Sequence, residues 1–332
     1  MTPFELTKQL MSIPSISGDE AEVGEYLSAY LTAAGYRIHR QVVENKRFNV
    51  LAFTTRDPKV VFCTHIDTVP PQLPIAEDDE CLYGRGACDT KGIVAAMLDA
   101  GARLRSSGIE EFAFLFVVGE EVNGIGARTA NRLKWTSEFV IVGEPTQNLM
   151  ARAQKGTLNA NLKFQGRAAH SGYPEEGISA IEGLWKVLDD CRQADWGNDA
   201  ILGHGTFNIG VFQGGERANI VPGTASASIM IRITEPGEQA ENKLRQIVAG
   251  RATLDVVSRN DPHLMHTVEG FPTTVVSFGS DVPYLDSLGK PLLVGPGSIL
   301  DAHTAQEKIT KRELMEGADL YERLVRRLLR SE

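Results

Sequence analysis

Residues 60–71 read VVFCTHIDTVPP, an apolar and largely β-branched run that leads into His65, Ile66 and Asp67 and stops at two prolines. Such a run predicts a strand buried on both faces, as in a parallel sheet covered by helices. Side chains alternate along a strand, so His65 and Asp67 point to the same side. Ligands of open α/β sheets gather at the carboxyl ends of the strands. The stretch therefore puts an imidazole and a carboxylate where a functional site is expected.

Strand and helix patterns alternate on either side of this stretch. Further buried strands are predicted within residues 112–121 and 139–146, and a helix between them and the first strand at residues 93–108. This order predicts an α/β fold with a mostly parallel sheet covered by helices. From residue 153 the order becomes strand, helix, strand, strand, helix, strand, which suits a small α+β, ferredoxin-like domain. We therefore expect one domain from residues 1–152 and 266–332, with a second domain inserted at residues 153–265.

Composition narrows the class of protein. The chain has 332 residues, 42% of them hydrophobic, and a formal net charge of -9, so a basic nucleic-acid surface is not expected. The sequence has no run of 18 or more apolar residues, so no membrane span is predicted. The N-terminus lacks the pattern of a signal peptide. The four cysteines show no CxxC spacing, which indicates idle thiols in a reducing compartment. A cytoplasmic location is the expectation.

Other ionisable side chains also follow predicted strands. Asp89 precedes a helix in GRGACDTKG, where a helix N-cap is the alternative interpretation. Glu120 and Glu121 end a buried strand, and two adjacent carboxylates there repel each other unless a cation is near, although a solvated acidic turn is also possible. Glu144 ends the strand before Pro145, and His303 lies in a loop rich in glycine.

Taken together, these side chains favour a metal site. Histidine and carboxylate ligands suit zinc, and also cobalt or manganese. The ligands suffice for two divalent ions that share one bridging carboxylate. A two-metal site lowers the pKa of a bound water and polarises a carbonyl group, which is the chemistry of a hydrolase.

The ordered motifs THIDTVP, GRGACDTKG, GEE, GEPT and AHTAQE resemble those of the M20 metallopeptidase family, which includes acetylornithine deacetylase, succinyl-diaminopimelate desuccinylase and aminoacylases. The resemblance spans nearly the whole chain and implies a zinc-exopeptidase-like catalytic domain. It also implies that the inserted domain serves as a lid and as the contact surface of a homodimer.

The resemblance implies a role for each candidate residue. His65 and Glu144 would bind one metal ion, Glu121 and His303 the other, and Asp89 would bridge them. Asp67 would orient His65. Glu120 would act as the general base, taking a proton from the attacking water and passing it to the leaving amine.

In the inserted domain, the resemblance implies that His170 in GRAAHSGYP stabilises the oxyanion in the partner subunit's site. Asn219 and Arg232 would hold the carboxylate of the substrate, and Ser280 in FGSD would line the same pocket. From the residues alone, His170 would be interpreted as a turn residue after a strand. For Arg232, a charge on a strand face is an equal alternative.

These expectations lead to an N-acyl-amino-acid amidohydrolase, with N-acetylornithine first among the substrates and a place in arginine biosynthesis. Alternatives within enzymes are N-acetylcitrulline or N-acetyl-lysine deacetylase, succinyl-diaminopimelate desuccinylase, and an M20 dipeptidase or carboxypeptidase. Lys155 stands where desuccinylases carry paired arginines, which weakens a diacid substrate. A non-catalytic binding protein and a two-metal phosphoesterase are further classes. The retained Glu120 speaks against the first, and the lack of a GxxxxGK[ST] loop against the second.

Overall fold

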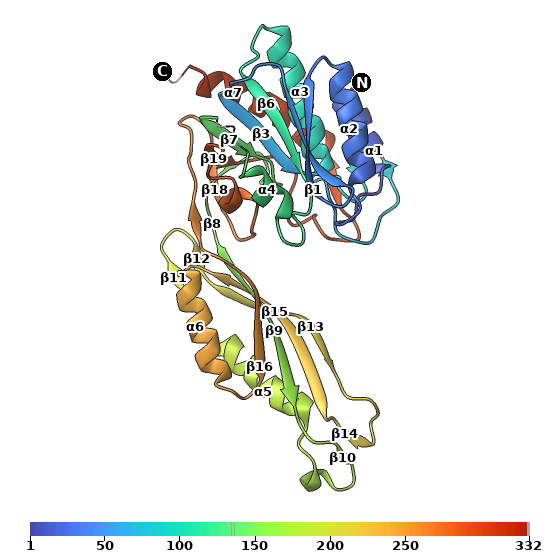
Figure 1. The fold of residues 1–332 in the computed structure, drawn as a ribbon, viewed down its shortest axis with the longest axis vertical. Helices are drawn as coiled ribbons and strands as arrows, with labels where there is room; N and C mark the ends of the chain where they lie inside the picture. The colour runs from blue at the N-terminus through green and yellow to red at the C-terminus, as the bar shows by residue number, and fades with distance from the viewer. Residues whose placement is uncertain (134, 136, 331–332) are drawn as a thin grey trace. The chain divides into compact units, whose positions relative to one another are not determined.

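The chain forms two compact units in this computed structural model, which describes residues 1–133, 135 and 137–330 (Figure 1). Unit 1 is built from Met1–Arg152, Met265–Thr274 and the segment from Ser280 onward. Unit 2 is built from Ala153–Leu264 and the short segment Val275–Gly279. Each unit has its own hydrophobic core.

The helices of unit 1 are α1 (Pro3–Met11), α2 (Ala21–Ala33), α3 (Lys91–Ser106), α4 (Ile125–Ala130) and α7 (Lys311–Leu328). Its larger sheet contains β1 (Arg37–Glu44), β2 (Arg47–Phe53), β3 (Val60–His65), β6 (Phe112–Val117), β7 (Phe139–Val142), β8 (Met150–Gln154), β17 (His263–Leu264), β18 (Thr273–Val276) and β19 (Lys290–Leu293). A small second sheet joins β4 (Ala76–Glu77), β5 (Cys81–Tyr83) and β20 (Lys308–Thr310).

The centre of the larger sheet is parallel. Its strand order runs β1-β2-β6-β3-β7-β19-β8-β17, and β18 pairs with β8. Strand β3 is parallel to both β6 and β7, and β19 is parallel to β7. The strands toward the two ends of this order are antiparallel. The mostly parallel α/β sheet predicted from the sequence is thus confirmed. Because parallel strands run the same way, the loops after β3, β6, β7 and β19 leave from one edge of the sheet.

An aromatic cluster anchors the helices to this sheet. The ring of Phe62 on β3 lies 5.5 Å from that of Phe114, 5.9 Å from that of Phe112 and 5.7 Å from that of Tyr321 on α7. All four side chains are buried. On α3, Gly101 permits close packing, since a Cβ at that position would lie 2.4 Å from the Phe114 ring. The apolar residues of α3 and the aromatic residues of β6 therefore pack together in one core.

Unit 2 is an α+β sandwich. Its main sheet has the order β13-β15-β9-β16, formed by β9 (Gly156–Gln165), β13 (Thr206–Gly214), β15 (Thr224–Ile233) and β16 (Thr253–Asn260). Helices α5 (Ala180–Gln193) and α6 (Gly237–Val248) pack on it. Short strands complete the unit: β10 (Ala169–His170), β11 (Asn198–Asp199), β12 (Gly203–His204) and β14 (Ile220–Val221). The all-antiparallel pairing matches the ferredoxin-like arrangement expected from the order of the elements.

All four cysteines are free and buried, as the absence of a CxxC spacing predicts. Among the described helices, none combines the length and the apolar character that crossing a membrane requires.

Truncation of Phe62 should test the aromatic cluster. We expect Phe62→Ala to lower the free energy of unfolding by about 3–5 kcal/mol, because it leaves a cavity between three other rings. The exposed Val42, changed to Ala, should alter it by no more than about 0.5 kcal/mol. Urea denaturation of the two variants measures both values, and equal effects would contradict the assignment of Phe62 to the core.

Candidate metal centre

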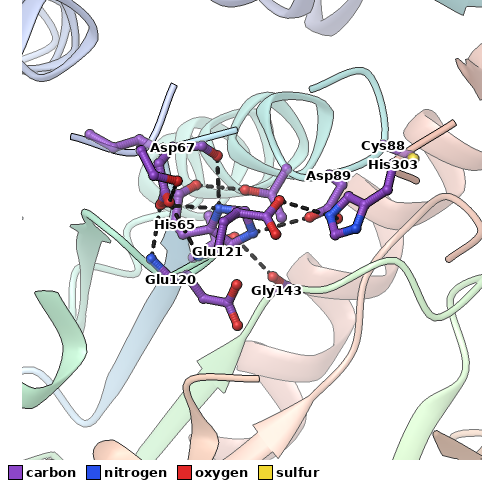
Figure 2. Close-up of polar contacts among 12 residues, drawn as sticks. His65, Asp67, Cys88, Asp89, Glu120, Glu121, Gly143 and His303 are labelled. Carbon is purple, nitrogen blue, oxygen red and sulfur yellow. Dashed lines mark hydrogen bonds and ion pairs between the residues drawn. The ribbon is translucent and has the colours of Figure 1, made fainter. Parts of the chain in front are cut away.

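Seven of the predicted site residues meet in unit 1, beyond the carboxyl ends of the parallel strands. Figure 2 shows all of them except Glu144. His65 is the last residue of β3, and Asp67 follows it. The turn after β6 carries Glu120 and Glu121, and the loop after β7 carries Glu144. Asp89 precedes α3, and His303 comes from the loop after β19. Segments more than 200 residues apart in the chain thus contribute to one cluster.

Asp89 lies between the two histidines. Its Oδ1 is 3.1 Å from Nε2 of His65, and its Oδ2 is 3.3 Å from Nε2 of His303. His303 Nε2 is also 3.0 Å from Oε1 of Glu121. Ligand atoms of His65, Asp89 and Glu121 all fall within 4.8 Å of one another. A carboxylate that offers one oxygen toward each of two imidazoles has the arrangement of a bridging ligand.

Asp67 connects the first strand to the glutamate turn. The ring of His65 turns its Nδ1 toward this residue, 3.0 Å from the backbone oxygen and 3.5 Å from Oδ1. The carboxylate also accepts the backbone N–H of Glu120 at 3.1 Å and of Glu121 at 3.2 Å. Ser17 donates its hydroxyl to Oδ2 at 2.7 Å. Asp67 therefore fixes both the ring of one candidate ligand and the backbone of the next.

Glu144 reaches the cluster because β7 passes very close to α3. A Cβ on the preceding residue, Gly143, would lie 2.5 Å from both Ile93 and Met97, so only glycine fits there. Gly143 also accepts a hydrogen bond from the hydroxyl of Thr64 at 2.8 Å, which ties β7 to β3. The Glu144 side chain is buried, and its pKa is raised well above the ordinary value by loss of water and by the nearby charge of Glu120.

The cluster carries more negative than positive charge. Burial raises the pKa of Glu120 well above its usual value, and the charges of Asp281 and Glu121 add to this. Burial also raises the pKa of Glu121, against the hydrogen bond from His303. For His65, burial favours the neutral ring, but hydrogen bonds to Asp67 and Asp89 raise its pKa well above the usual value. Divalent cations would balance such a set of buried carboxylates, and the donor atoms are of the kind that zinc accepts.

The backbone of His303 is held in an unusual conformation. Its φ is +61°, in the left-handed region that side chains other than glycine seldom adopt. Strain of this sort is retained where the surrounding structure determines it and is common at functional sites. Hydrogen bonds to Asp89 and Glu121 raise the pKa of His303 to about 10. The loop conformation thus serves to turn the imidazole toward the carboxylates.

The other predicted site residues are not part of this cluster. His170, Asn219 and Arg232 belong to unit 2. His170 is exposed on β10, where its Nδ1 accepts the N–H of Gly172 at 3.1 Å. Asn219 is also exposed, and it directly precedes Ile220 of β14, the residue that pairs with His170. Arg232 lies on β15, opposite Thr157 of β9. Ser280 is a buried residue of unit 1, and its hydroxyl accepts the N–H of Val282.

Two residues of the cluster's surroundings were missed by the sequence analysis. Ser17 lies in a loop, and nothing in its local sequence indicates that it meets Asp67, 50 residues away. Asp281 follows Ser280 and is 2% exposed, with an Oδ1 that has no hydrogen-bond partner. Burial raises the pKa of Asp281 to about 7, and the nearby Asp67 charge adds to the shift.

Asp281 should make the stability of the chelator-treated protein depend on pH. Its pKa in the folded state, about 7, exceeds the ordinary value of 3.8, so the folded state keeps a proton that the unfolded state loses in this window. The free energy of unfolding should therefore fall as the pH rises from about 4 to about 7. In Asp281→Asn, which cannot titrate at this position, this fall should be smaller by up to about 4 kcal/mol. Urea denaturation at both pH values measures it, with the exposed Asp57→Asn as control. A fall of the same size in Asp281→Asn would show that another group is responsible.

Comparisons of the sequence place the chain among known proteins. The family model described as the peptidase dimerisation domain of M20 proteins matches residues 152–255. A peptidase M20 domain-containing protein of Schizosaccharomyces pombe is 38% identical, over 97% of this chain and 84% of that protein. A probable carboxypeptidase of Aspergillus clavatus is 34% identical, over 97% of this chain and 88% of that protein.

Solved structures share the fold. A tripeptidase of Staphylococcus aureus aligns with a TM-score of 0.79 at 22% identity, covering 98% of each chain. The dipeptidase Dug1p of Saccharomyces cerevisiae aligns with a TM-score of 0.80 at 14% identity, covering 99% of this chain and 96% of its own. An M20 metallo-carboxypeptidase of Sulfolobus solfataricus gives 0.77 at 17%, covering 98% and 99%. With a full-length relative at 38% identity and a site suited to the divalent metals that the family uses, the chain belongs to the M20 family of metallopeptidases, enzymes that hydrolyse peptide-type amide bonds.

Proposed function

We propose that this enzyme uses two divalent metal ions to hydrolyse the amide bond between an acyl group and an amino acid with a free carboxylate. The observation that carries the proposal is the position of Asp89, whose two oxygens face the Nε2 atoms of two different histidines. His65 and Glu144 would hold one ion, and Glu121 and His303 the other. Zinc suits these ligands best, with cobalt or manganese as alternatives.

Glu120 is the proposed general base. When bound, the two cations would supply Lewis-acid chemistry, polarising the amide carbonyl and lowering the pKa of the attacking water. Glu120 takes a proton from that water as its oxygen bonds to the carbonyl carbon. It then gives the proton to the nitrogen as the C–N bond breaks, which releases a carboxylate and a free amine. The backbone N–H groups of Glu120 and Glu121 donate hydrogen bonds to the Asp67 carboxylate, which keeps the Glu120 backbone in place.

Unit 2 is proposed to contribute binding of the substrate and of a second copy of the chain. His170 would stabilise the oxyanion, and Asn219 and Arg232 would bind the substrate carboxylate, with Ser280 of unit 1 in the same pocket. The match of residues 152–255 to a dimerisation domain supports a homodimer formed through this unit. The cytoplasmic location stays a prediction of the sequence.

Two candidates are proposed for the acyl group and the amino acid of the substrate. The names of the relatives, probable carboxypeptidases, support a peptide-like substrate cleaved at its C-terminal residue. The segment GPGSILDAHTAQE at residues 295–307 resembles that of acetylornithine and acetyl-lysine deacetylases, which makes N-acetylornithine and acetylated basic amino acids a second candidate. Lys155 donates its Nζ to the backbone oxygen of His204 at 2.6 Å, so its charge is engaged within unit 2. This supports the view that a second carboxylate on the substrate is not recognised there.

A substrate panel should separate these candidates. We expect release of free amino acid from N-acyl amino acids or dipeptides with a free carboxylate, and at least about a hundredfold lower kcat/KM for the matching C-terminal amides, which lose the Arg232 ion pair. Ninhydrin detection of the product measures each rate, with N-acetylornithine and N-succinyl amino acids in the same panel. Faster cleavage of the amides would overturn the proposed orientation of the substrate.

Glu120→Gln should separate metal binding from catalysis. Loss of the general base should lower kcat by at least about a hundredfold, while the bound zinc measured by atomic absorption stays unchanged. The exposed Glu111→Gln is the matched control and should keep full activity. Chelation should abolish the activity of the wild-type chain, and added zinc should restore it. Full turnover by Glu120→Gln would contradict the assigned mechanism.

A further inference from the structure

A buried ion pair lies next to the candidate bridging ligand but outside the proposed set of ligands. Arg85 donates through Nη1 to Oε2 of Glu307 at 2.6 Å, and the two residues are 2% and 1% exposed. Both belong to motifs quoted for the family resemblance, GRGACDTKG and AHTAQE, where no role was assigned to either of them. Their place in unit 1 invites the question of what the pair does.

Stability alone is a weak reason for such a pair. Removing two charges from water costs several kcal/mol per ion, and well-packed apolar residues in the same place are often as stable or more so. A buried ion pair therefore calls for hydrogen bonds that use its remaining lone pairs. Glu307 has such bonds, and they lead toward the metal centre.

The second oxygen of Glu307 holds the backbone that carries Asp89. Oε1 accepts the backbone N–H of Asp89 at 3.2 Å and that of Cys88 at 3.3 Å. Asp89 thereby starts from a backbone fixed by a buried anion, while its own side chain lies between His65 and His303. The two oxygens of Glu307 thus have separate partners, Arg85 on one and the Asp89 backbone on the other.

The same contacts join two loops that are far apart in the chain. Glu307 lies four residues after His303 and accepts the backbone N–H of Gly84 at 2.9 Å through its own backbone oxygen. Arg85 Nε donates to the backbone oxygen of Pro71 at 3.2 Å. The loop that carries His303 and the loop that carries Asp89 are therefore fixed to each other by both the backbone and the side chain of Glu307.

We propose that Glu307, held by Arg85, is a positioning residue that fixes Asp89 in register with His303, so that both reach the same metal ion. Glu307 acts through Asp89 and does not touch the substrate. The inference rests on the proposed two-metal function, and it extends that function to residues beyond the ligands. Partners that orient metal ligands typically change metal affinity about 10- to 100-fold when they are removed.

Two double variants isolate the hydrogen bonds from the charge. Removing Glu307 alone would leave Arg85 buried without a counter-charge, so Arg85→Met is combined with either Glu307→Gln or Glu307→Leu. Both double variants lack the ion pair, but only the glutamine keeps an oxygen that can accept the N–H of Asp89. We expect the leucine variant to bind Zn²⁺ at least about tenfold more weakly than the glutamine variant.

Zinc affinity of the chelator-treated full chain, measured in competition with a chromogenic chelator, is the readout. A merely structural role would change the urea midpoint of the metal-free protein and leave the two zinc affinities equal, which would overturn the proposal. If the leucine variant does not fold, Glu307→Asp tests the same point, because it keeps the charge but is too short to reach both partners. Zinc affinity of Glu307→Asp equal to that of the wild type would also overturn it.

An ion pair of unit 2 provides the matched control for the Glu307 variants. Glu235 forms an ion pair with Lys243 at 2.6 Å in unit 2, and Glu235→Asp should leave zinc affinity unchanged. Wild-type protein that fails to bind zinc would refute the proposed function itself. Wild-type protein that binds zinc no better than the leucine double variant would refute only the role of Glu307.

Discussion

The structure depends on one constraint, which is the burial of several carboxylates close together. Carboxylates from four different segments converge beyond the tips of parallel strands, and burial raises the pKa of Glu120, Glu121 and Glu144. Two imidazoles are the cationic groups found within the cluster among the described residues. A folded chain keeps such a set only if divalent cations, or protons in their absence, offset the repulsion.

The supporting hydrogen bonds come from segments remote from the ligands. Asp67 receives the backbone N–H groups of the glutamate turn, and Ser17 from the N-terminal region completes its contacts. Glu307, near the C-terminal helix, does the same for the backbone of Asp89. The backbone of the glutamate turn and the backbone of Asp89 are thus each held by a buried carboxylate. Each of these carboxylates also has a further hydrogen-bond partner, Ser17 for Asp67 and Arg85 for Glu307. Such support matters because a ligand displaced by about an ångström binds its ion far less well.

Division of the chain into two units separates two tasks. The candidate ligands and the proposed general base all belong to unit 1, whose parallel strands bring their tips together. Unit 2 carries the residues proposed for the substrate carboxylate and the oxyanion.

The sequence by itself determined the α/β class, the change in the order of strands and helices near residue 153, and the set of ionisable side chains at the strand ends. Those features follow from local periodicity, which each segment carries on its own. The resemblance of the motifs also implied that Asp89 stands between His65 and His303. Tertiary structure alone decided that Ser17 meets Asp67 and that Glu307 meets the backbone of Asp89. These contacts join residues as many as 218 positions apart. They depend on strand order and loop path, which no local pattern encodes, because the free energy that selects them arises only when the whole core is packed.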